Sequence, residues 1–397
     1  MQLELPDDRQ PVIIAALRTP ICRANGALKH LRSHELLAPV LSALLTDTGV
    51  DAGEVADVVV GNAVGAGGNV ARLTALEAGL PVTVPGLTVD RQCGSGLDAI
   101  VLASRLVAAG GGTYLAGGVE SISTAPLRAH RNDDGEAAFF SRAQFAPHGH
   151  GDPDMGVAAE NVAREYGISR ARQDEFALRS HRRAVAAQAK GTFARETVAL
   201  PADSGSAAIT ADDGPRPKLN EALMARFPAA FVESGSVTAG NSCFDADGAA
   251  AVVITSLARA RELGAADALA VLGTETAGVE PKLLGIGAAA AASRLLAAKS
   301  VDAADVDLVE FNEAFASQTI ACLDRLGIDS LRANADGGAL ALGHAYGASG
   351  AVLVTRLLAQ ARQVPNQTPS AQGKLALAMI SIAGGMGTAA LFRHIRL

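Results

Sequence analysis

The sequence repeats one arrangement of strand, turn and helix in its two halves. An apolar run ends just before Asn62, and Cys93 follows Asn62 by 31 residues. A second apolar run ends at Asn312, and His344 follows Asn312 by 32 residues. A repeated spacing of this kind is typical of a duplicated structural unit. We therefore predict two similar halves with Cys93 and His344 at matching turns; chance similarity between Ala- and Gly-rich segments is the alternative.

Apolar runs alternate with segments of helical periodicity along most of the chain, which favours a layered α/β fold. Between residues 121 and 248 the pattern changes to charged and polar loops with two helices, as in an insertion laid over a core domain. The predicted strands are 12–16, 55–60, 113–119, 249–256, 268–272, 306–311 and 375–382, and the predicted helices are 36–45, 71–80, 97–107, 158–166, 169–190, 258–263, 288–297 and 350–361.

Composition narrows the class of protein. The 397 residues carry a formal net charge of −7, which argues against a surface dominated by nucleic-acid binding. The four cysteines lie far apart with no C-x-x-C pair, so we expect no disulfide framework, no metal site and a reducing, cytoplasmic environment. We also expect no signal peptide and no stretch long and apolar enough to span a bilayer.

Cys93 stands in a polar turn between an apolar run and a helical segment, and two glycines follow it closely. Unpaired amides at a helix N-terminus lower the pKa of a nearby thiol, and glycines let a second group approach the backbone. We therefore predict a nucleophilic cysteine for acyl transfer. A buried cysteine without chemistry is the alternative.

Three further positions suggest the same chemistry. Asn312 directly follows a strand, where an amide can bind an oxyanion, although it can equally cap a helix. His344 lies in a Gly-rich apolar turn, where it either accepts the proton of Cys93 or is a structural histidine with a bonded partner. Ser381 opens a Gly-rich segment in which the amide of Ala383 can contribute to an oxyanion hole.

One charged segment resembles a metal-ligand set. His148, His150, Asp152 and Asp154 alternate along residues 148–154. A charged loop is the interpretation that we favour, and we expect no metal.

Sequence blocks along essentially the whole chain resemble the thiolases, which exchange acyl groups between coenzyme A thioesters. The matching blocks are Arg18-Thr19-Pro20, Ala116-Gly117-Gly118-Val119-Glu120-Ser121, Met155-Gly156, Ala159-Glu160-Asn161, Thr238-Ala239-Gly240-Asn241, Asp247-Gly248-Ala249-Ala250, Asn312-Glu313-Ala314-Phe315 and Gly343-His344.

The resemblance implies a five-layered αβαβα fold made of two duplicated halves with an inserted loop domain. The N-terminal half would comprise residues 1–120 and 249–266, the loop domain, which binds coenzyme A, residues 121–248, and the C-terminal half residues 267–397. Family members are usually dimers or dimers of dimers, so a homodimer or homotetramer is expected. Coenzyme A thioesters are the implied substrates, without a resident cofactor, nucleic acid or membrane partner.

The resemblance also implies roles for individual residues. Cys93 would be acylated by the donor thioester, His344 would activate it, and Asn312 with a water molecule would hold the acyl-CoA oxygen. Coenzyme A would contact Arg216 with its adenosine end; a solvated loop arginine is the alternative. The implied binding residues along the pantetheine and acyl path are Met155, Cys243 and Phe315.

The chain departs from the family at the position of a second catalytic cysteine, which is Ser381 here. That cysteine removes the α-proton of acetyl-CoA, and an alcohol is a much weaker base than a thiolate. Either carbon–carbon bond formation is slow or the base is supplied differently; Cys243 is one conceivable substitute. Two function classes stay open: a thiolase-type acyltransferase, and a thiolase-like acyl-CoA-binding protein without efficient Claisen chemistry.

We predict that Ser381→Cys raises the turnover of acetoacetyl-CoA thiolysis, because loss of a general base costs on the order of 10²–10⁴-fold in rate. Steady-state thiolysis by the wild type and the variant measures this effect. An unchanged turnover would show that the base lies elsewhere in the protein.

Overall fold

The computed structural model describes residues 3–65, 67–203, 207–363 and 373–397. Its strands and helices largely follow the predicted order, and the bounds are as follows. The strands are β1 Pro11–Arg18, β2 Cys22–Arg23, β3 Val55–Gly61, β4 Gly86–Val89, β5 Thr113–Glu120, β6 Arg128–Arg131, β7 Ala137–Phe140, β8 Ala246–Ser256, β9 Asp267–Gly278, β10 Leu308–Phe311, β11 Leu375–Ile382 and β12 Met386–Arg396. The α-helices are α1 Ser33–Thr48, α2 Val70–Glu77, α3 Ser95–Gly110, α4 Met155–Glu165, α5 Arg170–Ala189, α6 Glu221–Met224, α7 Leu257–Glu262, α8 Gly287–Ala298, α9 Ala316–Leu326, α10 Ala339–Leu342 and α11 Tyr346–Gln363.

The sheet contains the same strand order twice. One half runs β4-β3-β5-β8-β1 and the other β10-β11-β12-β9. In the first half the parallel strands β4, β3 and β5 are followed by the antiparallel strands β8 and β1, and in the second the parallel strands β10 and β11 are followed by the antiparallel strands β12 and β9. A parallel bridge from Val309 to Ala333 in the second half stands where β4 pairs with β3 in the first. The predicted duplication therefore matches the pairing of the strands. Antiparallel pairing of β1 with β9 joins the two halves into one continuous sheet.

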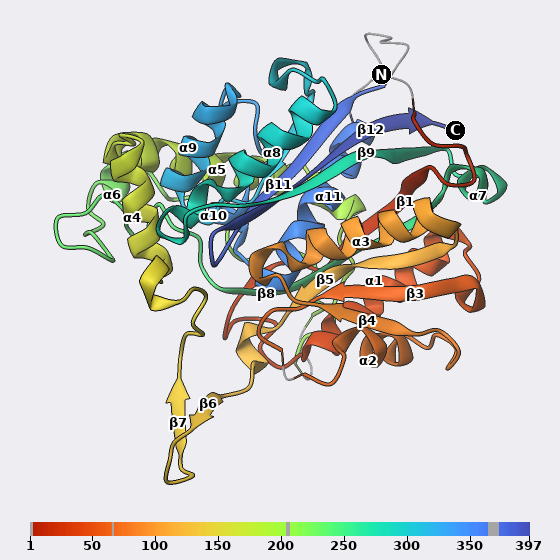
Figure 1. The fold of residues 1–397 in the computed structure, drawn as a ribbon, viewed down its shortest axis with the longest axis horizontal. Coiled ribbons are helices and arrows are strands. Elements are labelled where there is room, and N and C mark those ends of the chain that lie inside the picture. The colour runs from red at the N-terminus through yellow and green to blue at the C-terminus, as the bar shows by residue number, and fades with distance from the viewer. Residues whose placement is uncertain (1–2, 66, 204–206, 364–372) are drawn as a thin grey trace.

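Three apolar clusters define the layers. Along β11, Leu377 and Met379 face one cluster while Ala378 and Ile380 face another, as the two-residue period of a strand requires. Helices α1 and α2 cover the outer face of the first half, α8 and α9 that of the second, and α3 and α11 lie between them (Figure 1). This arrangement confirms the five-layered αβαβα fold.

The insertion follows β5 in the sequence but packs largely on the other half. Helices α4 and α5 contact α9, and their apolar residues belong to the same cluster as α8. Ser169 caps α5 by accepting a hydrogen bond from the amide of Arg172, as its sequence signal indicates. The β6–β7 hairpin extends away from the body (Figure 1). Strand β8 begins at Ala246, three residues before the predicted start.

One expectation about helices was wrong. Among the described residues, the stretch Gln92–Gly110 is long and apolar enough to cross a membrane by length and composition, whereas we expected none. This stretch contains α3, which packs against α11 and β5 in the central cluster. A buried core helix meets the same two criteria, so its apolar composition has a structural explanation.

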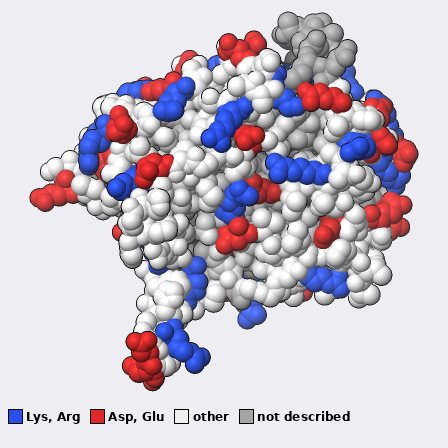
Figure 2. Space-filling view, viewed as in Figure 1, with Lys and Arg blue, Asp and Glu red and all other residues white. Residues whose placement is uncertain are grey.

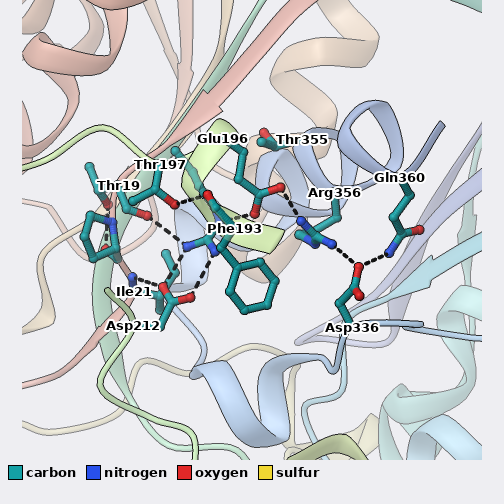
Figure 3. Close-up of polar contacts among 12 residues, drawn as sticks. Thr19, Ile21, Phe193, Glu196, Thr197, Asp212, Asp336, Thr355, Arg356 and Gln360 are labelled. Carbon is teal, nitrogen blue, oxygen red and sulfur yellow. Dashed lines mark hydrogen bonds and ion pairs between the residues drawn. The ribbon is translucent and has the colours of Figure 1, made fainter. Parts of the chain in front are cut away.

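A network of buried charges joins both halves and the insertion (Figure 3). Arg18 of β1 contacts Glu196 and Asp212 of the insertion, each at 2.7 Å. Arg356 of α11 pairs with the other oxygen of Glu196 and with Asp336. Both guanidinium groups also lie about 5 Å from the ring of Phe193, at 5.0 and 4.8 Å.

The outer surface in Figure 2 carries acidic and basic side chains that are interspersed rather than gathered into one patch. This distribution matches the modest negative net charge of the chain.

We predict that Arg356→Met lowers the free energy of unfolding by about 3–5 kcal/mol, because buried Glu196 would lose one of its two partners and partly buried Asp336 would lose its arginine. Urea denaturation measures the change. The control is Arg172→Met, which breaks the half-exposed pair with Asp324 and should cost less than about 1 kcal/mol. Equal losses in both variants would contradict a special contribution of the buried network.

Candidate active site

Cys93 lies in a single 3₁₀ turn, Gln92–Gly94, between β4 and α3. Gln92 has a φ of 48°, an uncommon conformation for a side-chain-bearing residue. The hydroxyl of Ser95 holds this turn in place by donating to the carbonyl of Gln92 at 2.6 Å and accepting from the amide of Arg91 at 2.8 Å. The turn therefore presents the thiol at the N-terminus of α3.

The prediction that the turn lowers the pKa of Cys93 was wrong. Burial raises the pKa of the Cys93 thiol to about 12, and the charges of Glu120 and Asp245 raise it further. Hydrogen bonds from the amides of Ala383 and of Cys93 itself act in the opposite direction but do not outweigh burial. Cys93 is thus a neutral thiol before the reaction. The amide of Ala383, which we predicted to contribute to an oxyanion hole, lies within hydrogen-bonding reach of the Cys93 sulfur.

His344 is buried and its tautomer follows from its neighbours. Its Nδ1 lies 2.7 Å from the hydroxyl oxygen of Ser349, and that hydroxyl donates its single proton to the carbonyl of Ala345 at 3.0 Å. Nδ1 must therefore carry the proton and donate it to Ser349, which leaves a lone pair on Nε2. Nε2 is buried and has no hydrogen-bond partner among the described residues. Burial lowers the pKa of His344 to about 4, so the ring is neutral.

The turns of Cys93 and His344 lie together because the two following helices touch. A Cβ added at Gly96 would lie 2.5 Å from the carbonyl oxygen of Gly347, and α11 packs against the turn that contains Cys93. Gly347 also donates its amide to Glu120 at 3.0 Å. The two predicted reactive groups therefore come from neighbouring turns of one central layer.

Asn312 directly follows β10, and its backbone amide donates to Met379 of β11 at 3.2 Å. The residue is buried. The alternative that Asn312 caps a helix is wrong, since the N-cap residue of α9 is Phe315. Asn312 and Ser349 line one small cavity, which places the amide in the neighbourhood of the His344 turn.

Ser381 lies in β11 with its hydroxyl engaged on both sides. The oxygen donates to the carbonyl of Gly285 at 2.6 Å and accepts from the amide of Ala288 at 3.1 Å. Gly285 belongs to the 3₁₀ turn Pro281–Ile286 and Ala288 to the first turn of α8, so this hydroxyl ties the start of α8 and the turn before it to the sheet. A catalytic role for Ser381 stays a prediction.

The other predicted binding residues converge from three segments. Cys243 donates its amide to the carbonyl of Ala314, next to Phe315, and its thiol lies close enough to Cys93 for the two charges to interact. The ring of Phe315 meets Phe231 edge-on at 6.0 Å. The Phe231 ring in turn covers the residue after Met155, which begins α4. Met155, Cys243 and Phe315 thus lie along one path.

Arg216 is exposed and belongs to a basic group that the sequence did not suggest. Its amide donates to Nδ1 of His181 at 3.2 Å. Burial lowers the pKa of His181, and the positive charges of Arg216 and Arg23 lower it further, to about 4 in all. The guanidinium of Arg23 lies 3.8 Å from the centre of the Phe244 ring, beside Cys243. Positive charge therefore gathers near the outer end of this path.

A cavity of about 350 Å³ opens beside Tyr346, which follows His344 by two residues. Most of its lining is apolar and comes from the base of the β6–β7 hairpin and the preceding segment, including Leu127 and Phe139. Asp245 and Tyr346 also line it. The hydroxyl of Tyr346 donates to Asp245.

The segment with four candidate metal ligands is held by an arginine instead. Asp152 accepts from Arg142 at 2.7 Å, and Asp154 lies 3.4 Å from the same guanidinium. Within the described parts of the chain, no group of three or more His, Cys, Asp and Glu side chains is placed to hold a metal ion.

Sequence reasoning missed Ser349, Arg23, Asp245 and Tyr346. Tyr346 and Ser349 follow His344 by two and five residues, which is the one signal that could have found them. Asp245 and Arg23 carried no sequence signal, because their neighbours come from distant segments.

Comparison with known proteins identifies the same family over almost the whole chain. Residues 11–258 match the family model "Thiolase, N-terminal domain" and residues 267–394 match "Thiolase, C-terminal domain". A Staphylococcus epidermidis protein named "Putative acetyl-CoA C-acetyltransferase VraB" is 42% identical over 391 residues, 97% of this chain and 99% of that protein. A Bacillus subtilis protein named "Putative acetyl-CoA C-acetyltransferase YhfS" is 43% identical over 386 residues, covering 96% and 98%.

A solved structure shows the same fold. The crystal structure of the Bacillus anthracis acetyl-CoA acetyltransferase superposes with a TM-score of 0.87 at 33% identity, over 98% of this chain and 99% of that one. The two matched domain models and the relatives that share its full length lead to one conclusion: this chain belongs to the thiolase family.

Proposed function

We propose that the protein is a thiolase-type acyltransferase that converts an acyl-CoA and acetyl-CoA into a 3-ketoacyl-CoA and coenzyme A, or runs the reverse thiolysis, through an acyl-Cys93 intermediate. Two relatives carry the name acetyl-CoA C-acetyltransferase, which supports this class of substrate. The observation that carries the proposal is the buried, unpartnered Nε2 of His344 beside the turn of Cys93.

In the first half-reaction the thiol of Cys93 attacks the carbonyl carbon of the donor thioester. Its proton passes to Nε2 of His344, whose Nδ1 proton is held by Ser349. The carbon–sulfur bond to coenzyme A then breaks, and the departing thiolate takes the proton from Nε2. The amide of Ala383, which reaches the sulfur of Cys93, is placed to stabilise negative charge next to it.

Both groups are neutral before the reaction, since burial raises the pKa of Cys93 and lowers the pKa of His344. Proton transfer therefore accompanies the attack of the sulfur. The burial of both groups favours this order, because a resting thiolate–imidazolium pair would carry a large desolvation cost.

Coenzyme A fits the path that leads outward from Cys93. The pantetheine arm would pass Met155, Cys243 and Phe315, and the phosphates would meet the positive charges of Arg216 and Arg23. The 350 Å³ cavity with its apolar lining would take the acyl chain.

A second function is an acyl-CoA-binding protein with acyl exchange but little Claisen chemistry. The specific observation that favours it is that the hydroxyl of Ser381 already donates to the carbonyl of Gly285 and accepts from the amide of Ala288 in α8. In that case Cys93 would still be acylated, because acylation does not need a base at the α-carbon.

We further propose a homodimer or homotetramer in the cytoplasm that needs no resident cofactor. Leu127 and Phe139 are 87% and 68% exposed at the β6–β7 hairpin, which is apolar surface of the kind that subunit contacts cover.

We predict that mixing the protein with acetyl-CoA adds one acetyl group to Cys93, which intact-mass and peptide mass spectrometry detect. Cys93→Ala should abolish both the acetyl adduct and thiolysis, because it removes the nucleophile. Cys22→Ala, which alters a buried cysteine outside the site, serves as the control and should retain the adduct. Thiolysis that survives Cys93→Ala would overturn the mechanism.

A further inference from the structure

Carbon–carbon bond formation needs a base at the acceptor, and the hydroxyl of Ser381 does not offer one. Two carboxylates lie close enough to Cys93 for their charges to act on its thiol, Glu120 and Asp245. The two carboxylates differ in their burial and in their hydrogen bonds, and therefore in whether a bound acetyl thioester can reach them.

Glu120 is buried, and both of its carboxylate oxygens accept hydrogen bonds from the protein. It is 0% exposed, and it accepts hydrogen bonds from the side chain of Asn62 at 2.7 Å, the amide of Ala63 at 2.9 Å and the amide of Gly347 at 3.0 Å. These bonds fix the start of α11 to the end of β3. Glu120 is therefore a structural group behind the reacting atoms.

Asp245 is exposed and lines the 350 Å³ cavity, and its charge acts on the thiol of Cys93. Its backbone lies in parallel register with His344, whose amide donates to the carbonyl of Phe244 at 2.9 Å and whose carbonyl accepts from Ala246 at 3.3 Å. Paired residues of neighbouring strands lie side by side, so Asp245 stands next to His344.

Tyr346 fixes the orientation of this carboxylate. Its hydroxyl donates to Oδ1 of Asp245, and its ring meets that of His344 edge-on at 5.1 Å. Oδ1 is thus occupied by Tyr346, and no other described side chain donates to Oδ2. Asp245 lines the cavity, and the lone pairs of its Oδ2 stay available to accept a proton.

The other groups near Cys93 keep their protons. Burial raises the pKa values of the Cys243 thiol and of the Tyr346 hydroxyl, so neither becomes a base at neutral pH. His344 offers a lone pair, but in the proposed function it serves the proton of Cys93.

We propose that Asp245 is the catalytic base that removes the α-proton of the acceptor acetyl thioester, and that Tyr346 is its positioning residue. This inference rests on the proposed function. Oδ2 takes the proton from the methyl carbon, and the electrons of the C–H bond form an enolate. The enolate carbon attacks the carbonyl of acyl-Cys93, the carbon–sulfur bond breaks, and the leaving thiolate of Cys93 takes the proton back from Asp245. Thiolysis runs the same steps in reverse, with Asp245 returning the proton to the enolate.

The test separates proton removal from acylation. The full-length protein is incubated with deuterated acetyl-CoA in ordinary water; mass spectrometry follows both the loss of deuterium from the acetyl group and the acetyl adduct on Cys93. Asp245→Asn keeps the size of the side chain and an acceptor for Tyr346. We expect it to slow exchange by about 10²-fold or more while the rate of adduct formation changes only a few-fold.

Two further variants complete the experiment. Asp305→Asn, an exposed carboxylate in the turn Ala303–Asp305, is the matched control and should exchange like the wild type. Tyr346→Phe should slow exchange by about tenfold without loss of the adduct, because the carboxylate loses its fixed orientation. If Asp245→Asn also loses the acetyl adduct on Cys93, the exchange rate of Tyr346→Phe alone tests the role of Asp245.

The assignment of Asp245 would be overturned if Asp245→Asn exchanged deuterium as fast as the wild type. If that variant cannot be acylated, the same result in Tyr346→Phe would overturn it. A wild-type protein that forms no acetyl-Cys93 would instead overturn the proposed function, so the two failures have different signatures.

Discussion

The site depends on direct backbone contact between two helix N-termini. A Cβ at Gly96 would lie 2.5 Å from the oxygen of Gly347, and one at Gly350 would lie 2.4 Å from the amide nitrogen of Leu97. Any side chain at these glycines would separate α3 from α11 by at least the size of a methyl group. Reacting atoms must approach to about 3–3.5 Å, so this contact governs whether the turn of Cys93 can meet the turn of His344.

The two halves of the duplicated sheet carry different residues at equivalent turns, Cys93 in one half and His344 in the other. One copy of the turn carries a sulfur and the other an imidazole, and each stands before a helix of the central layer. Because the layer is enclosed by the two halves of the sheet, both groups are neutral and the amides around them are held rigidly. In the proposed reaction the charge appears only as bonds change, in surroundings that are already oriented for it.

Most of the fold could be predicted because its signals are local. Apolar runs predicted β3, β5 and β11, and the cap at Ser169 predicted the start of α5. Strand β12 was missed because three of its first five residues are Gly or Ala and only Thr388 among them is β-branched. The pKa of Cys93 was predicted in the wrong direction since helix amides are visible in a sequence and burial is not. The pairing of Tyr346 with Asp245 spans 101 residues and could not be read from either neighbourhood.

The buried charges also bear on how the protein matures. Glu196 binds Arg18 from 178 residues upstream and Arg356 from 160 residues downstream. A ribosome releases Arg18 and Glu196 long before Arg356, and until then one oxygen of a buried carboxylate lacks its counter-ion. Strand β12 pairs with both β9 and β11 and follows them in the chain, so it also emerges after them. The N-terminal half therefore gains the last counter-ion of its buried network only after much of the C-terminal half has been translated.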